Sequence, residues 1–95
     1  MGASFGKADL TDCSFRGANL SHTDLDGAKL ERVDLTGTDL TDALLGVHCL
    51  AGDVPLDNAC LKDTRFDDIS GFTLNGRQVT EDELRKRGAY FIKDL

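Results

Sequence analysis

The sequence predicts an all-β solenoid, a chain wound into stacked square coils, over most of its 95 residues. The first observation is that leucine or phenylalanine returns at every fifth position from Phe5 to Leu45. The second is that a small or compact residue stands two places before each of them. Neither a helix, with about 3.6 residues per turn, nor a strand, with a period of about two, keeps positions five apart on one buried wall. A chain that turns a corner every five residues does, and four such turns make a coil of about twenty residues that stacks on its neighbours at the strand spacing of about 4.8 Å.

The residue at the centre of each repeat is predicted to point inward and to build the core. With about twenty residues per coil, Leu10, Leu30 and Leu50 should form one apolar column. The small residue two places earlier fits because a narrow tube has no room for a second large side chain. Cys13 stands at one of these small positions and is predicted to be a buried apolar filler. The predicted core residues are Phe5, Leu10, Phe15, Leu20, Leu25, Leu30, Leu35, Leu40, Leu45, Leu61 and Phe66.

The repeats resemble those of pentapeptide-repeat proteins, whose motif is A(D/N)LXX. The copies that carry the resemblance are ADLTD at 8–12, ANLSH at 18–22, TDLDG at 23–27, VDLTG at 33–37 and TDLTD at 38–42. The match extends over about residues 1–71. The resemblance implies a right-handed quadrilateral β-helix of about 3.5 to 4 coils, with the central and the small residues both pointing inward.

Between residues 46 and 53 the repeat slips by one position, within the segment GVHCLAGDVP. One interpretation is an insertion tolerated at a corner. The other is a short projecting loop, which on a rigid scaffold is a favoured place for function. Leu44 and Val47 add apolar groups at outward positions beside this segment, which could form a small contact patch. The candidate partner-binding residues are Leu44, Val47, His48 and Asp53.

The chain changes character after residue 71, which divides it into a repeat domain, 1–71, and a C-terminal region, 72–95. In the segment 72–79, apolar residues flank Asn75 and Gly76. An Asn-Gly pair between apolar residues predicts a β-hairpin with a tight turn.

The hairpin is followed by a predicted short helix. Thr80 and Glu83 have the spacing of a capping box, and Val79 and Leu84 have that of a hydrophobic staple around it. Basic residues fill the last turn, and Gly88 stands at the C-terminal cap position. The hairpin and the helix are therefore predicted to cap the solenoid, because an uncapped last coil exposes strand edges and apolar core.

Tyr90, Phe91 and Ile92 are predicted either to complete this cap or to contact a second copy of the chain. At the other end, the repeat begins almost at Met1, so the first coil is predicted to be open. Two alternatives follow: subunits that dimerise or stack end to end, or a module that belongs to a longer polypeptide.

Composition excludes several classes of protein. Seventeen acidic and eleven basic side chains give a net charge of −6, so direct binding to nucleic-acid phosphates is not expected. No apolar run approaches the roughly 20 residues of a membrane span, and the first residues lack a secretory pattern, so we expect no membrane insertion and, by default, a cytoplasmic location. Three cysteines without a CxxC pair indicate neither a disulfide framework nor a structural zinc site.

The repeats supply no catalytic constellation. Asp9, Asp24, Asp34 and Asp39 all stand directly before a central residue. Such a series could indicate paired-carboxylate catalysis or cation binding, but its period favours a structural role, in which a short polar side chain satisfies backbone N–H groups at the corners. We therefore predict no catalytic residues, no metal and no cofactor.

Three functions remain open. The preferred one is a non-enzymatic scaffold for protein–protein interaction. The second is implied by the resemblance, because some pentapeptide-repeat proteins are quinolone-resistance factors that occupy the DNA-binding saddle of type II topoisomerases such as gyrase. This DNA mimicry would require a dimer, because one chain of about four coils is shorter than a turn of DNA, about 34 Å. The third is a repeat module of a larger secreted bacterial effector.

Overall fold

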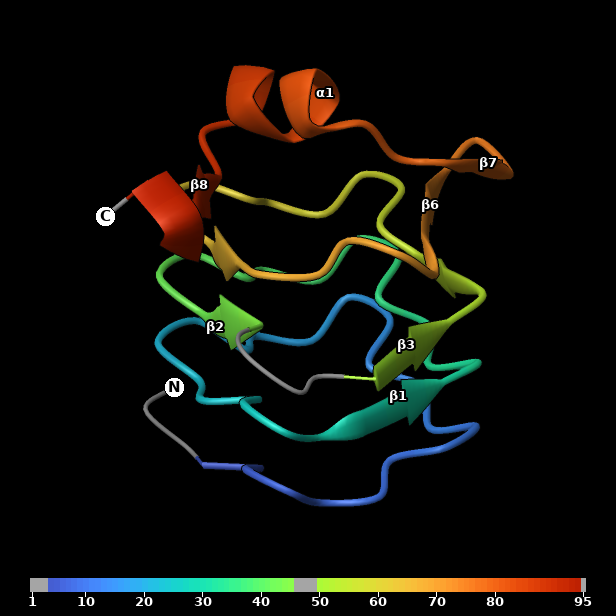
Figure 1. Ribbon diagram of the computed structural model, residues 1–95. Coiled ribbons are helices and arrows are strands. Elements are labelled where there is room, and N and C mark those ends of the chain that lie inside the picture. Colours follow the sequence, from blue (N-terminus) through green and yellow to red (C-terminus); the bar gives the residue numbers. More distant parts are fainter. Residues whose placement is uncertain (1–3, 46–49, 95) are drawn as a thin grey trace.

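The computed structural model describes residues 4–45 and 50–94, with residues 50 and 51 described in their backbone only. Successive coils pair through parallel bridges, and in the first coils the paired residues are 20 apart in the sequence. One such bridge lies on each of the four faces, between Ser4 and Asp24, Asp9 and Lys29, Ser14 and Asp34, and Asn19 and Asp39. Figure 1 shows the coils stacked on one another, with the N-terminal coil at one end and the only labelled helix, α1, at the other.

The strands are short because the chain turns again after two or three residues. They are β1 (Lys29–Glu31), β2 (Leu44–Leu45), β3 (Leu50–Gly52), β4 (Val54–Pro55), β5 (Arg65–Phe66), β6 (Phe72–Leu74), β7 (Arg77–Gln78) and β8 (Tyr90–Phe91). Strand β1 pairs with β3, β5 lies between β2 and β8, and β4 pairs with β6, all in parallel. Only the β6–β7 pair is antiparallel among these strands.

Each corner is a hydrogen-bonded turn. The N–H of the small residue donates to the carbonyl of the preceding central residue, as from Ala8 to Phe5 at 2.9 Å. The third residue of the turn has a positive φ, for example 63° at Lys7. Glycine adopts this left-handed conformation freely, and Asn and Asp adopt it more readily than other residues. The corner residues with this conformation up to residue 45 are Lys7, Asp12, Gly17, His22, Gly27, Arg32, Gly37 and Asp42.

The aspartates before the central residues stabilise these turns. Asp9, Asp24, Asp34 and Asp39 each accept a hydrogen bond from the backbone N–H two residues ahead, at 3.1, 2.8, 2.9 and 3.0 Å. Asn19 makes the same bond at 2.9 Å. The structural interpretation of this acidic series is therefore confirmed, and these carboxylates are engaged by their own turns.

Threonine at the small inward positions satisfies a second backbone acceptor. Thr64 is 0% exposed, and its hydroxyl donates to the carbonyl of Leu40 at 2.7 Å. Thr38 donates in the same way to the carbonyl of Phe15, also at 2.7 Å. Since the carbonyl of Leu40 also accepts the turn N–H of Ala43, the hydroxyl uses its remaining lone pair. A polar residue thus fits the core without an unsatisfied group.

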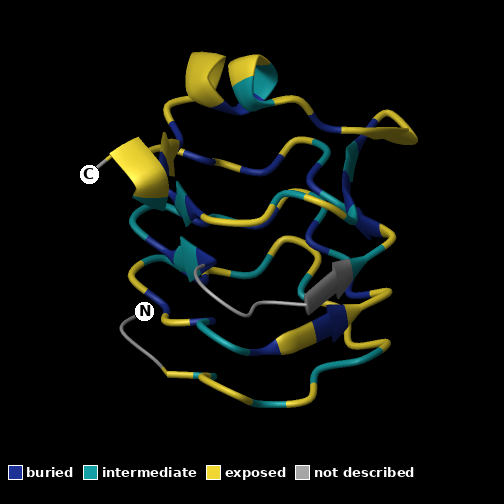
Figure 2. Cartoon of the chain, in the orientation of Figure 1, coloured by how far each residue is buried: buried dark blue, intermediate teal, exposed yellow. Residues whose placement is uncertain are grey.

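The core is buried in the middle coils and open in the first one, as Figure 2 shows. Leu25, Leu30, Leu35, Leu40 and Leu45 are at most 1% exposed. The residues that lie within the predicted series but at its N-terminal end are only partly buried, namely Phe5, Leu10 and Phe15. This is a partial correction of the predicted core, and its cause is that the first coil has a neighbour on one side only.

Cys13 is exposed, so the prediction of a buried filler is wrong. The repeat places it correctly: Ser14 pairs with Asp34, which puts Cys13 directly beneath Val33, and Val33 is 0% exposed. The two residues differ in burial because Val33 lies between two coils, whereas Cys13 lies in the first described coil.

A one-residue insertion changes the register in the middle of the chain. Leu44 pairs with Asp24, 20 residues earlier, whereas Leu30 pairs with Ala51, 21 residues later. The extra residue therefore enters between Leu44 and Ala51. The predicted apolar column is wrong at its last member, because the register places Ala51 rather than Leu50 opposite Leu30.

The C-terminal region returns over the last coil. Asn75 and Gly76, with φ of 55° and 77°, form the turn between β6 and β7, which is the geometry of a type I′ hairpin. Helix α1 (Glu81–Lys86) follows and lies across the end of the coils in Figure 1. Its capping box is present, since Thr80 and Glu83 exchange bonds of 2.9 and 3.2 Å between side chain and backbone N–H.

Candidate functional site

The described residues offer little for catalysis or for a metal. No group of three or more His, Cys, Asp or Glu side chains in residues 4–45 and 50–94 is arranged to hold a metal ion. Within the same ranges, no helix combines the length and the apolar character that crossing a membrane requires. The search for a functional site therefore turns to the outer faces.

One face departs from the repeat in three successive coils. We call it the tyrosine face and define it by its outward row, which is Ser4, Asp24, Leu44, Arg65 and Tyr90. Ser4 and Asp24 accept the N–H of their own turns at 3.5 and 2.8 Å, as in the other repeats. The next three residues replace this short acceptor with Leu, Arg and Tyr. Tyr90, at 51%, is the one exposed large hydrophobic residue in the part of the chain that the structure describes.

An open groove of about 500 Å³ lies where the tyrosine face meets the preceding corner. It is lined by His22, Asp42, Asp63, Arg65 and Tyr90, and we refer to these five residues as the groove. The first three are corner residues with φ of 59°, 59° and 57°, stacked in successive coils. The other two come from the neighbouring strands β5 and β8, which pair in parallel.

Strand pairing holds the walls of the groove in place. The N–H of Tyr90 donates to the carbonyl of Thr64 at 2.8 Å, and the N–H of Asp63 donates to the carbonyl of Gly88 at 2.8 Å. These bonds tie the last strand to the corner below it. Tyr90 and Asp63 are therefore presented at the same end of the groove by backbone contacts rather than by a loose loop.

The charges in the groove are divided between its two ends. His22 Nδ1 lies 3.6 Å from Asp42 Oδ2. Arg65 Nη2 donates to the backbone carbonyl of Asp42 at 3.0 Å, so its guanidinium reaches one coil down from its own strand. Both basic groups thus lie around Asp42. No ion pair joins Asp63 to any residue in the described ranges.

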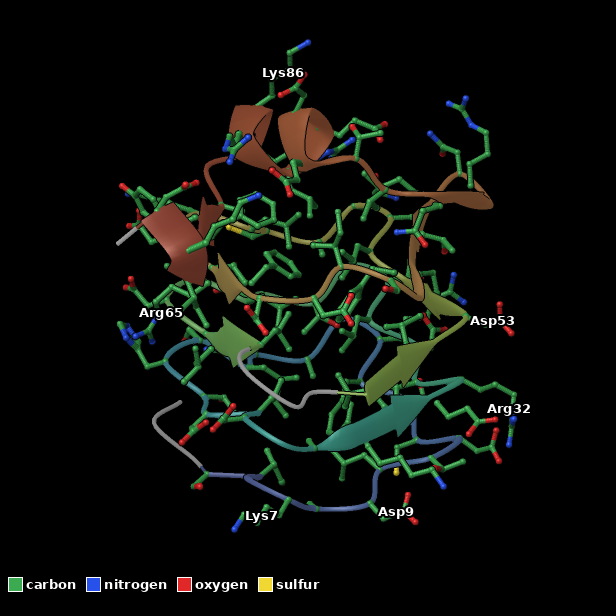
Figure 3. All side chains as sticks on the ribbon, in the orientation of Figure 1. Lys7, Asp9, Arg32, Asp53, Arg65 and Lys86 are labelled. Atoms are coloured by element: carbon green, nitrogen blue, oxygen red, sulfur yellow. The ribbon has the colours of Figure 1, made fainter. Side chains whose placement is uncertain are left out.

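The predicted partner-binding residues are not brought together as one site. Leu44 lies on the tyrosine face in β2 and is half-buried. Asp53 occupies a different corner, the one that carries Arg32, and Figure 3 shows Asp53 and Arg65 on opposite sides of the molecule. Val47 and His48 lie outside the described residues.

Of the three predicted cap or dimer residues, only Tyr90 presents its side chain outward. Phe91 is 2% exposed, and the guanidinium of Arg85 and the ammonium of Lys93 lie 4.8 and 5.8 Å from its ring centre. Phe91 is therefore an internal contact. Ile92 begins the short 3₁₀ helix η1 (Ile92–Asp94) and is half-buried.

Four of the groove residues were not singled out from the sequence: His22, Asp42, Asp63 and Arg65. A signal for three of them was available, because His22, Asp42 and Asp63 are separated by 20 and then 21 residues, one coil and one coil with the insertion. Their approach to Tyr90 has no such signal, since it depends on the length of the hairpin and helix that bring β8 back to β5.

The comparisons with known proteins agree with the repeat pattern. Residues 2–45 match the family model described as pentapeptide repeats, in 8 copies. None of the curated proteins matches the chain. Among solved structures, the chain is similar to alr5209, a pentapeptide repeat protein from Nostoc PCC 7120, with 23% identity, coverage of 96% of this chain and 82% of that one, and a TM-score of 0.44.

A second solved structure, AT2G44920, is a pentapeptide repeat protein from the thylakoid lumen of Arabidopsis thaliana. It is 13% identical, with coverage of 87% of this chain and 72% of that one, and a TM-score of 0.45. The family assignment rests on the match to the repeats themselves: residues 2–45 of this chain belong to the pentapeptide-repeat family.

Proposed function

We propose that the chain is a non-enzymatic scaffold that binds another protein through its tyrosine face. The observation that supports this is the groove beside Tyr90, a rigid surface with one exposed aromatic ring and charges of both signs. Pentapeptide-repeat proteins are in general structural scaffolds rather than enzymes. The aspartates that could have supplied chemistry are bound to their own turns.

The composition of the groove is that of a protein interface. Tyrosine and arginine are enriched among the residues that contribute most to binding between proteins. Arg65 and Tyr90 stand on paired strands, so little backbone freedom is lost when a partner binds. Leu44 continues the same row and extends the apolar part of the surface.

The proposal is tested by placing a photo-cross-linking phenylalanine analogue at position 90 and, as a control, at position 77. Arg77 is exposed in β7, which belongs to a different sheet. We expect a discrete partner to cross-link from position 90 only, in cells that express the protein, and the product to be lost when Arg65→Ala is added. The same products from both positions, or a product unaffected by Arg65→Ala, would contradict the proposal.

We do not favour DNA mimicry. The four aspartates that precede central residues, Asp9, Asp24, Asp34 and Asp39, lie on four different faces. An imitation of a phosphate backbone needs an acidic series along one surface, and here the groove also contains Arg65. A stable dimer in light scattering, together with inhibition of gyrase supercoiling, would reverse this preference.

A further inference from the structure

The two ends of the groove differ in what they can bind. At the lower end, His22 and Arg65 surround Asp42 at 3.6 Å from its carboxylate and 3.0 Å from its carbonyl. At the upper end, Asp63 and the exposed ring of Tyr90 lie one coil farther along, or about 4.8 Å in a β-helix. The carboxylate of Asp63 has no cationic partner among the described side chains.

We propose that the upper end of the groove binds a lysine or arginine side chain of the partner protein, between the carboxylate of Asp63 and the ring of Tyr90. A carboxylate beside an aromatic face is a suitable environment for a cation, because the ion pair and the cation–π contact act on the same group. Arg65 does not occupy this end, since its guanidinium is held on the carbonyl of Asp42. The long stem of a lysine or arginine would also pack on the ring.

This inference rests on the proposed function and adds the chemistry of the residue that is recognised. The contact is weak by itself, because an exposed ion pair contributes about 0.2–1 kcal/mol and an exposed cation–π contact about 0.5–1 kcal/mol. A single basic residue should therefore bind at millimolar concentration. A protein partner would add further contacts along Leu44 and Arg65.

The test is a titration of the full ¹⁵N-labelled chain, followed by NMR, with short blocked peptides that contain one lysine or one arginine between glycines. Matched peptides contain glutamate or norleucine instead. We expect saturable shifts at the amides of Asp63, Arg65 and Tyr90 with the basic peptides only, and weaker binding at high salt. Shifts that scatter over the molecule, or an equal response to the glutamate peptide, would overturn the inference.

Two variants and one control locate the site. Asp63→Asn removes the charge and keeps a residue type suited to the left-handed φ of 57°, as Asn58 shows at φ 58°. It should weaken the basic peptides about two- to fivefold, and Tyr90→Leu should have an effect of similar size. Asp53→Asn is the matched control, because Asp53 is a corner residue with φ 54° on the opposite side of the molecule.

Equal losses from Asp63→Asn and Asp53→Asn would indicate a general charge effect and would overturn the inference. If Asp63→Asn is too unstable to titrate, unchanged binding by Tyr90→Leu would have the same meaning. The proposed function fails separately: a partner that still cross-links from position 90 but is indifferent to Asp63→Asn would leave the scaffold function standing and refute the recognition of a basic residue.

Discussion

Replacing Asp39 tests how the repeats stabilise their turns. Its Oδ1 accepts two hydrogen bonds from Thr41, at 3.0 Å from the backbone N–H and 2.7 Å from the hydroxyl. One coil below, Asn19 makes the same two contacts with Ser21, at 2.9 and 2.6 Å. The two residues are paired in the structure, so the chain contains its own comparison between a charged and a neutral acceptor at one position.

We expect Asp39→Ala to lower the free energy of unfolding by about 1 kcal/mol, because the loss of a side-chain acceptor at a helix N-cap, a comparable bond, costs about 0.5–2 kcal/mol. For a domain of this size that is a fall in Tm of about 4–8 °C. Asp39→Asn should cost much less, since Asn19 shows that an amide oxygen reaches the same donors.

The pH dependence provides a second measurement. The hydrogen bonds from Thr41 favour the ionised carboxylate and lower the pKa of Asp39 below its ordinary value of 3.8. A pKa that is lower in the folded than in the unfolded state contributes stability above about pH 4, and this stability is lost as the pH falls through the folded pKa. Asp39→Asn should therefore reduce the loss of stability in acid.

Thermal unfolding followed by circular dichroism, at neutral pH and near pH 3, measures both effects. A matched variant is Asp67→Ala, because Asp67 is exposed and its side chain makes no hydrogen bond in the described structure. If Asp39→Asn costs as much as Asp39→Ala at neutral pH, the acceptor bonds are not the source of the stability. No cost for Asp39→Ala would refute the role of the turn bonds altogether.

Three further predictions follow from burial. Thr64→Val should lower the free energy of unfolding by about 1 kcal/mol, because the bond to the carbonyl of Leu40 is lost while its shape is kept; urea denaturation measures it, and an unchanged midpoint would contradict the bond. Leu30→Ala should cost about 2–5 kcal/mol and Leu10→Ala clearly less, because only Leu30 lies between two coils; equal costs in the same assay would mean that the first coil is covered in solution. Cys13 should react with a thiol reagent in the folded state at nearly the rate of a free thiol, tested in a variant that lacks the other cysteines, and protection would contradict its exposure.

The period of five was sufficient to predict which residues point inward and how long a coil is. Leu25, Leu35 and Leu45 are buried where the pattern places them, and the pairing of Asp24 with Leu44 has the expected spacing. Such a prediction succeeds because each repeat makes the same contacts as the one before it, so nine copies reinforce a single geometry.

Burial could not be predicted from the repeat alone. Cys13 and Val33 occupy equivalent positions, yet one is exposed and the other is 0% exposed. Leu10 and Leu30 differ in the same way. The sequence pattern specifies the direction of a side chain, whereas its exposure depends on whether another coil lies above and below, and a local pattern does not carry that information.

The candidate site depends on where the repeat is broken. At Ser4 and Asp24 the tyrosine face keeps the short acceptor that stabilises the turn, and at Leu44, Arg65 and Tyr90 it gives that acceptor up. Each replacement forgoes a turn bond of about 0.5–2 kcal/mol, as estimated from N-caps. Local rules that are broken without a compensating gain in stability are characteristic of functional surfaces.

The same reasoning links the groove to the architecture. A regular solenoid distributes its polar residues over all faces, and each is used by its own turn, so the regular part of this chain offers a partner few free groups. Arg65 and Tyr90 lie beyond the segment that matches the family, residues 2–45. They are nevertheless placed by it, because β5 pairs with β2 and β8 pairs with β5. The repeats thus fix the position of the groove, and the C-terminal residues supply the side chains that could make it specific.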